Sequence, residues 1–492
     1  MTALSTAQVR ALAAATLLPG FTGTSLPEWL SGRLRAGLAG VCIFGGNIVS
    51  RHQLAALVGE IRAANPRAII AIDEEGGDVT RLYYDVGSPY PGNAVLGRLD
   101  DEAFTEHVAR IVGWELRRVG IDLDLAPDAD VNSNPRNPVI GTRSFGADPA
   151  LVARHTAAWV RGLQSTGVAA CVKHFPGHGD TELDSHLALP VVHGSLEALR
   201  GRELVPFAAA VAAEARSIMT SHMLLPDIDP DHVATFSSRV LQGVLRGELG
   251  FRGLIVTDAL DMAGASADSG IPRAAVRALA GGSDLLCLGT DTTAEQLDDI
   301  EAAVAEAVAN GALTDARLAD AADRVAALAT ASAAHADRLP VPEWVTLDDE
   351  PEFDGAVLQR AIDVLPGTVV GAERVLVALQ TVANIAVGVA PWGPAAAGAD
   401  VRGVHDLAAV DALLLEVPSD AQLVVVGQGI HRHAWTIAAV ERLRQHRTDT
   451  IVVEMGWPDA AALEVDVTTW GASRAMGAAL LATLDALAGG TA

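Results

Sequence analysis

The fold is predicted from stretches such as residues 68–77, AIIAIDEEGG, in which a short apolar run ends in acidic residues and glycines. A run of this length, bounded by turn-forming residues, is typical of a buried strand. Similar runs recur over about the first 330 residues. The others are ATLLPGF from Ala15, GVCIFGG from Gly40, IDLDLAPDADV from Ile121, ACVKHFPG from Ala170, SIMTSHM from Ser217, LIVTDALDM from Leu254 and DLLCLGTD from Asp284.

The segments between these runs have helical periodicity, as in QLAALVGEIRAA (residues 53–64) and FAAAVAAEA (residues 207–215). Eight strand–helix units in succession fit an α/β fold of the (β/α)8 TIM type better than an open doubly wound sheet. The open sheet is the alternative fold.

A second domain is predicted near the C-terminus. Residues 1–335 form the predicted barrel, residues 336–352 form a linker with prolines and a run of acids, and residues 353–492 form the second domain. Strand-like RVLVALQ, QLVVVGQG and DTIVVEMG alternate there with helical segments, which predicts a smaller αβα sandwich. No glycine-rich phosphate loop opens these helices, so nucleotide binding has little support.

Composition argues against several classes of partner. The chain has 35 Lys and Arg against 61 Asp and Glu, a formal net charge of −26, which repels nucleic acid and anionic lipid. No window of some eighteen residues is apolar enough to span a bilayer, and the N-terminal run ALAAATLLPGF lacks the flanks of a secretory signal. We therefore expect a cytoplasmic protein with no membrane partner; the oligomeric state is not predicted. Aromatic residues make up only 4% of the chain, so a small substrate is expected.

Cys42, Cys171 and Cys287 each lie in a different apolar run. Their odd number and wide spacing favour core residues in a reducing compartment over disulfides or metal ligands.

Polar residues follow several of the predicted strands. In a TIM-type barrel the carboxyl ends of the strands form one rim, where the chemistry takes place. We therefore expect these residues to converge on one face: Asp73 to Gly77, Asp128 to Asp130, Lys173 and His174, His222, Asp258 and Asp291.

KHFPGHGDTELDSH, residues 173–186, allows three interpretations. A zinc site is disfavoured because His174 and His178 flank Pro176 and Gly177 and no cysteine contributes, so no metal is predicted. A proton-transfer unit fits better, because Asp184 and His186 can lie on the same side of an extended segment and the carboxylate can hold the imidazole. A polar turn without chemistry is the third interpretation.

Asp258 ends the apolar run of VTDALDM. A rigidly held carboxylate there is suited to attack the anomeric carbon of a sugar, with a proton donor such as His186 opposite. Asp261 is the rival nucleophile, but it lies past the strand end.

KHFPGHGDT followed by DSH, VTDALDM, DEEGG-D-V-T-R and GTRSFG together resemble glycoside hydrolase family 3, in its bacterial β-N-acetylglucosaminidase branch. The resemblance covers roughly residues 5 to 335 and is loose beyond residue 350. It implies a retaining exo-β-N-acetylglucosaminidase without a cofactor, which acts on small GlcNAc glycosides of the muropeptide or chitin-oligomer type, for instance in cell-wall recycling.

The same resemblance implies a role for each matching residue. Asp258 would be the nucleophile that forms a covalent glycosyl-aspartate, His186 the acid/base and Asp184 its partner. The substrate-binding positions would be Asp73, Arg143, Lys173, His174, His222 and Met223.

Two positions depart from the family pattern. Ala259 stands where a second acid is frequent, and Asp78 stands where a basic or neutral residue is common. The role of the C-terminal domain stays open between a wall of the site, an oligomer contact and a spacer. His431 and His433 are expected at a surface or interface.

Two other functions remain. A neutral imidazole base would not repel an incoming anion, so phosphate could replace water as the acceptor and the chain would be a β-N-acetylglucosaminide or β-glucoside phosphorylase. A catalytically silent sugar-binding protein on the same scaffold is the other, because a fold does not fix a function.

Overall fold

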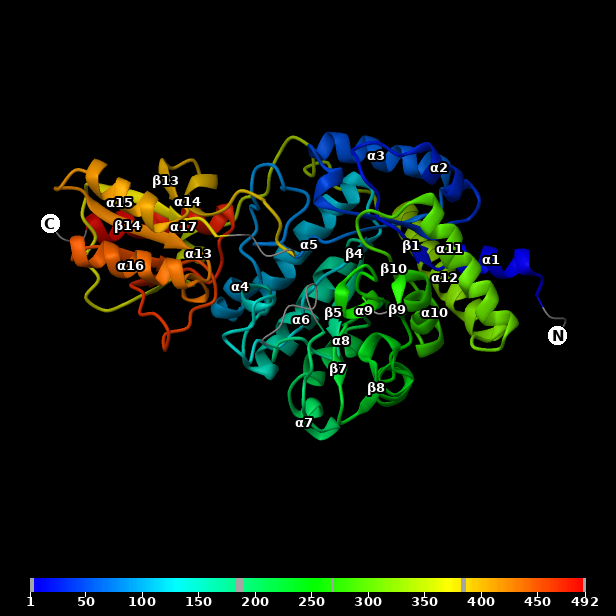
Figure 1. The fold of residues 1–492 in the computed structure, drawn as a ribbon. Coiled ribbons are helices and arrows are strands. Elements are labelled where there is room, and N and C mark those ends of the chain that lie inside the picture. Colours follow the sequence, from blue (N-terminus) through cyan, green and yellow to red (C-terminus); the bar gives the residue numbers. More distant parts are fainter. Residues whose placement is uncertain (1–3, 182–188, 268, 382–385, 490–492) are drawn as a thin grey trace.

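The computed structural model describes residues 4–181, 189–267, 269–381 and 386–489. Figure 1 shows a larger part that contains the N-terminal end and a smaller layered part that contains the C-terminal end.

Each of the eight predicted runs contains a strand. The strands are β1 (Leu17–Leu18), β2 (Gly40–Ile43), β3 (Ile69–Ile72), β4 (Leu123–Asp124), β5 (Ala169–Phe175), β6 (Ser217–Thr220), β9 (Leu254–Val256) and β10 (Leu286–Cys287). Six of them pair in parallel in the order β2-β3-β4-β5-β6-β9, and β1 pairs with β10. A parallel bridge between Val256 and Leu285 joins β9 to the β10 run, and Cys42 N donates to Pro19 O beside β1. The strands thus close into a ring, and the predicted TIM-type fold is confirmed over the open doubly wound sheet.

Strand residues alternate between the barrel interior and the surrounding helices. Ile70 and Ile72 pack in the core on the helix side, whereas Ala71 packs with Leu123 and Cys171 in a second, interior cluster. This alternation follows from the two-residue period of a strand and explains why both faces are apolar. The three cysteines are buried free thiols in this interior cluster, as predicted.

Helices surround the strands of the larger part (Figure 1). Their ends follow from local sequence: α5 begins after Asp101, whose carboxylate accepts from Phe104 N, and stops before Gly120, which caps it with φ 91°. The helices include α1 (Thr6–Ala14), α2 (Glu28–Arg35), α3 (Arg51–Ala64), α4 (Asn93–Leu99), α5 (Glu102–Val119), α6 (Pro149–Gln164), α7 (Leu196–Gly201), α8 (Leu204–Ala212), α9 (Ala263–Ser266), α10 (Gly270–Gly281), α11 (Ala294–Ala309) and α12 (Asp315–Arg338). A hairpin of β7 (Leu224–Leu225) and β8 (Asp229–Val233) follows β6.

The C-terminal part is a mixed sheet between two helical layers. Its strands are β11 (Asp363–Val364), β12 (Arg374–Leu379), β13 (Val401–Val404), β14 (Gln422–Gly427), β15 (Ile451–Glu454) and β16 (Val467–Thr468), in the order β11-β16-β15-β14-β12-β13. One core lies on the side of α15 (Leu407–Glu416) and α16 (Ala434–His446), and another on the side of α17 (Arg474–Gly489). The predicted αβα sandwich is confirmed, although β13 and the short strands β11 and β16 were not anticipated.

Between the two parts, α12 continues through Arg338, and the next helix is α13 (Gly355–Gln359). The division of the chain at residues 335 and 353 stays a prediction. Among the described residues, no helix combines the length and apolar character that crossing a bilayer requires.

Asp284 is a buried carboxylate that ties the barrel wall to α12. It accepts from Arg246 Nη2 at 2.6 Å, from Arg317 Nη2 at 2.5 Å and from Ile255 N at 2.9 Å, and its side chain is 1% exposed. Removing one member of a buried ionic network leaves uncompensated charge behind, which costs about 3–5 kcal/mol.

We predict that Asp284→Ala lowers the free energy of unfolding by about 3 kcal/mol or more, measured by urea denaturation. Asp320→Ala is the matched control, because Asp320 also pairs with Arg317 but its side chain is 50% exposed. The free energy of unfolding of Asp320→Ala should fall by less than about 1 kcal/mol. Equal losses in the two variants would contradict this assignment.

Candidate active site

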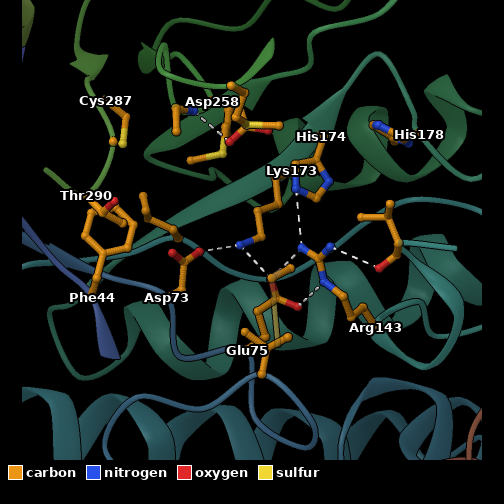
Figure 2. A pocket seen from close by; sticks show the side chains of 18 of the residues that line it. Phe44, Asp73, Glu75, Arg143, Lys173, His174, His178, Asp258, Cys287 and Thr290 are labelled. Carbon is orange, nitrogen blue, oxygen red and sulfur yellow. Dashed lines mark hydrogen bonds and ion pairs between the residues drawn. The ribbon is translucent and has the colours of Figure 1, made fainter. Parts of the chain in front are cut away.

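A cavity of about 300 Å³ opens at the carboxyl ends of the barrel strands. Asp73 follows β3, Lys173 and His174 lie at the end of β5, and Asp258 follows β9. All four line this cavity together with Arg143, which ends the 3-10 helix η2 (Gly141–Arg143) (Figure 2). The expected convergence on one rim therefore holds for these positions.

The floor of the cavity is an ionic network centred on Glu75. Lys173 Nζ lies 2.6 Å from Asp73 Oδ1 and 2.6 Å from Glu75 Oε1. Arg143 donates from Nε and Nη2 to the two oxygens of Glu75, at 2.9 and 2.7 Å (Figure 2). Two parallel charge-assisted hydrogen bonds of this kind fix both the position and the orientation of the Arg143 guanidinium relative to the Glu75 carboxylate.

The network keeps its members ionised. Burial alone would raise the pKa of Glu75, but Arg143 and Lys173 hold it well below its usual range. Burial would also lower the pKa of Lys173, but Asp73 and Glu75 raise it above its ordinary value. The cavity therefore presents fixed cationic donors beside a carboxylate acceptor, which together suit vicinal hydroxyls.

His174 is oriented by a buried carboxylate behind it. Its Nδ1 lies 2.7 Å from Asp130 Oδ2, and Asp130 also accepts from His178 N at 2.6 Å. Burial opposes ionisation of Asp130, but His174 and His178 hold its pKa below the ordinary value. An ionised Asp130 accepts the Nδ1 proton of His174 and so directs Nε2 towards Arg143 Nη2, 3.4 Å away.

Asp128, Asp130 and His174 each place one potential ligand atom within 4.8 Å of the others. Two of these groups are bonded to each other, because His174 Nδ1 lies 2.7 Å from Asp130 Oδ2. Asp128 Oδ2 forms a looser ion pair with Arg143 Nη2 at 3.7 Å and has no hydrogen-bond partner among the described residues. The set is consistent with a positioning network for His174 and Arg143.

Asp258 and Asp261 both line the cavity. Asp258 Oδ1 accepts from Ala259 N at 2.8 Å and its residue is half-buried, whereas Asp261 is exposed and accepts from Thr290 N at 3.3 Å. Asp258 is thus the more enclosed of the two carboxylates.

Other predicted positions are not among the described residues that line the cavity. Neither His222 nor Met223 is among the described residues that line it: His222 Nε2 lies 3.0 Å from Ala259 O, and Met223 is fully buried in the core. Their role as substrate contacts stays a prediction. Asp291 lies 3.0 Å from the Thr22 hydroxyl and is exposed.

Asp184 and His186 fall outside the described residues, so their assignment as a proton-transfer pair stays a prediction.

The sequence placed Asp73 to Gly77 together at the rim, but it assigned a sugar-binding role to Asp73 alone and none to Glu75. Glu75 lies two residues after Asp73, and in an extended segment side chains with this spacing lie on the same side. The spacing could therefore have indicated that Glu75 also faces the site. Glu74 points elsewhere: it accepts from Thr80 Oγ1 and from the backbone N–H of Arg81 and Leu82, and burial raises its pKa to about 7.

His178 makes stability depend on pH. Burial lowers its pKa from 6.5 to about 4, although Asp130 opposes this shift. Between pH 6.5 and 4 the unfolded chain therefore binds a proton that the folded chain excludes, so stability falls as the pH falls through this window.

We predict that acidification from pH 6.5 to 4.5 destabilises the wild type by roughly 2 kcal/mol more than it destabilises His178→Gln, measured by urea denaturation at both pH values. His193→Gln is the control, because the His193 side chain is 75% exposed, and it should keep the wild-type pH dependence. An unchanged dependence in His178→Gln would refute this account.

Comparison with known proteins shows the family of this chain. Residues 26–328 match the Glycosyl hydrolase family 3 N terminal domain. A β-hexosaminidase of Stenotrophomonas maltophilia (strain K279a) is 40% identical over 281 residues, which cover 55% of this chain and 82% of that protein. A β-hexosaminidase of Pseudomonas aeruginosa (strain LESB58) is 38% identical over 260 residues, 53% of this chain and 77% of that protein.

Among solved structures, a glycoside hydrolase family 3 β-N-acetylglucosaminidase from Paenibacillus sp. str. FPU-7 superposes with a TM-score of 0.88 at 31% identity, over 99% of this chain and 97% of that one. The similarity thus extends through the C-terminal part. The resemblance inferred from the motifs is confirmed: the chain belongs to glycosyl hydrolase family 3.

Proposed function

We propose that this chain is a retaining exo-β-N-acetylglucosaminidase, in which Asp258 forms a covalent bond to the sugar. The observation that carries the proposal is a small cavity at the barrel rim that combines an enclosed carboxylate, Asp258, with the fixed charges of Asp73, Lys173 and Arg143. The relatives at 40% and 38% identity are both β-hexosaminidases, which supports the reaction class.

In the first step, a carboxylate oxygen of Asp258 attacks the anomeric carbon while the bond to the leaving oxygen breaks. His186 gives its proton to that oxygen, so the aglycone departs as a neutral alcohol. Asp184 stabilises the imidazolium form of His186 before the transfer.

In the second step, neutral His186 takes a proton from water as the water oxygen attacks the anomeric carbon. The bond to Asp258 breaks and the carboxylate is restored. Two inversions return the sugar in its original β configuration, and His186 is protonated for the next cycle.

Substrate size follows from the cavity. A volume of about 300 Å³ is at the lower end for ligand pockets, which favours one terminal sugar over a long chain. The ionic floor supplies Lys173 and Arg143 as donors and Asp73 as an acceptor for its hydroxyls.

The finer parts of the proposal are the natural substrate and the location. We propose muropeptide fragments or chitin oligomers with a terminal GlcNAc as substrates, processed in the cytoplasm during cell-wall recycling. Hydrolysis is favoured over phosphorolysis and over a silent sugar-binding role, because the compared relatives are hexosaminidases and the nucleophile and sugar-contact positions are occupied.

We predict that Asp258→Ala lowers kcat for 4-nitrophenyl β-GlcNAc at least about a thousandfold, roughly 4 kcal/mol of transition-state free energy, with an unchanged Tm. Asp261→Ala is the matched control and should keep most of the activity. The assay is run with and without inorganic phosphate. Substantial activity of Asp258→Ala would remove this residue from the nucleophile role, and sugar 1-phosphate formed with faster turnover would replace the hydrolase by a phosphorylase.

For His186→Ala, the expected loss depends on the leaving group. The alcohol oxygen of the second sugar in a GlcNAc disaccharide needs a proton as it departs, so kcat/KM for the disaccharide should fall by about 10²–10⁴. The dinitrophenolate of a dinitrophenyl glycoside departs as a stable anion without protonation, so the loss of kcat/KM on this substrate should be at least about tenfold smaller. Steady-state kinetics on both substrates measures the ratio, and equal losses would argue against the acid role.

A further inference from the structure

The loops at the carboxyl ends of the C-terminal sheet face the barrel. β12 is flanked by β13 and β14, and ligands of such sheets usually bind at this change of direction. Here a space of only about 80 Å³ remains, lined by Gly77 and Asp78 of the barrel and by Trp392 and Gln428 of the C-terminal part. The usual ligand position is thus taken up by the barrel loop that follows β3.

Asp78 links three segments at this contact. Its Oδ1 accepts from Ala472 N of the C-terminal part at 2.8 Å, and its Oδ2 accepts from Thr142 Oγ1 at 2.8 Å. Thr142 directly precedes Arg143, and Asp78 follows the segment that carries Glu75. One carboxylate therefore connects the C-terminal part to both loops that form the Glu75–Arg143 pair.

Arg81 makes a second connection, at the cavity itself. Its Nη2 donates to Ala386 O at 2.7 Å and its Nη1 donates to Val387 O at 3.4 Å. Both Arg81 and Ala386 line the main cavity, and Arg81 is only 7% exposed. The guanidinium thus fixes a backbone segment of the C-terminal part at the wall of the cavity.

The neighbouring residues of that segment are held as well. Val389 N donates to the Tyr84 hydroxyl at 3.2 Å. Gly388 has φ +77°, and a Cβ there would lie 2.6 Å from the same hydroxyl oxygen. A side chain at residue 388 would therefore force either the Tyr84 side chain or the segment itself to shift, and it would have to adopt a positive φ.

We propose that the C-terminal part forms one wall of the sugar site, and that Arg81 is the positioning residue that holds Ala386 there. That the ligand of this site is a sugar rests on the proposed function. Three roles were considered for the C-terminal domain: a wall of the site, an oligomer contact and a spacer. The contacts of Arg81 with the segment at Ala386 favour the wall.

A wall that contacts the bound sugar equally before and during the reaction affects binding more than turnover. We expect Arg81→Met to raise KM and the inhibition constant of free GlcNAc about three- to tenfold, with kcat within about twofold of the wild type. Arg81→Lys keeps one cationic donor and should recover part of the affinity.

Arg98→Met is the matched control. Arg98 Nη2 also joins the barrel to the C-terminal part, through Asp363 Oδ1 at 2.6 Å, and both side chains are about half exposed. Arg98 is not among the described residues that line the cavity. Its replacement should leave KM, kcat and GlcNAc inhibition unchanged.

Ala386→Trp tests the wall directly and does not depend on the folding of Arg81→Met. A large side chain at this half-buried position should intrude on the cavity and raise KM at least about tenfold, with Tm unchanged. Wild-type cleavage of 4-nitrophenyl β-GlcNAc tests the proposed function separately. If the wild type is active and Ala386→Trp is folded, an unchanged KM and an unchanged inhibition by GlcNAc in this variant would overturn the proposed wall. Equal effects of Arg81→Met and Arg98→Met on KM would overturn the positioning role of Arg81.

Discussion

The site depends on one buried carboxylate, Glu75, held between Lys173 and Arg143. Taking three charges out of water is costly, and only complete pairing offsets that cost. Glu75 lies in the loop after β3, and its two partners come from the end of β5 and from η2, so their pairing fixes three separate segments relative to one another. The same pairing leaves the cations rigid before any sugar arrives, which lowers the entropy lost on binding.

The C-terminal part extends this constraint. Its backbone donates to Asp78 through Ala472 N and accepts from Arg81 through Ala386 O, and both barrel residues belong to the loop that begins at Glu75. Among the described residues that line the cavity, the second part thus contributes backbone and an apolar side chain, and no ionisable one. The small space left at the carboxyl ends of the C-terminal sheet is a physical consequence of that arrangement.

Much of the barrel could be predicted because each strand is short, apolar and followed by polar residues, and those polar residues lie where strand ends meet. The strand β13 was missed because VRGV is only partly buried, so its pattern is weak. Arg81 and Ala386 are 305 residues apart, and no local pattern predicts such a contact. His222 and Met223 follow β6 as expected, but backbone geometry decides which strand-end side chains reach the cavity, and that geometry is not visible in sequence.

The central claim is that Asp258 bonds covalently to the sugar. Incubation with 5-fluoro-GlcNAc fluoride, followed by peptide mass spectrometry, traps and locates the glycosyl-enzyme. The account predicts a single labelled peptide with the sugar on Asp258. A label on Asp261 or on any other residue would contradict it.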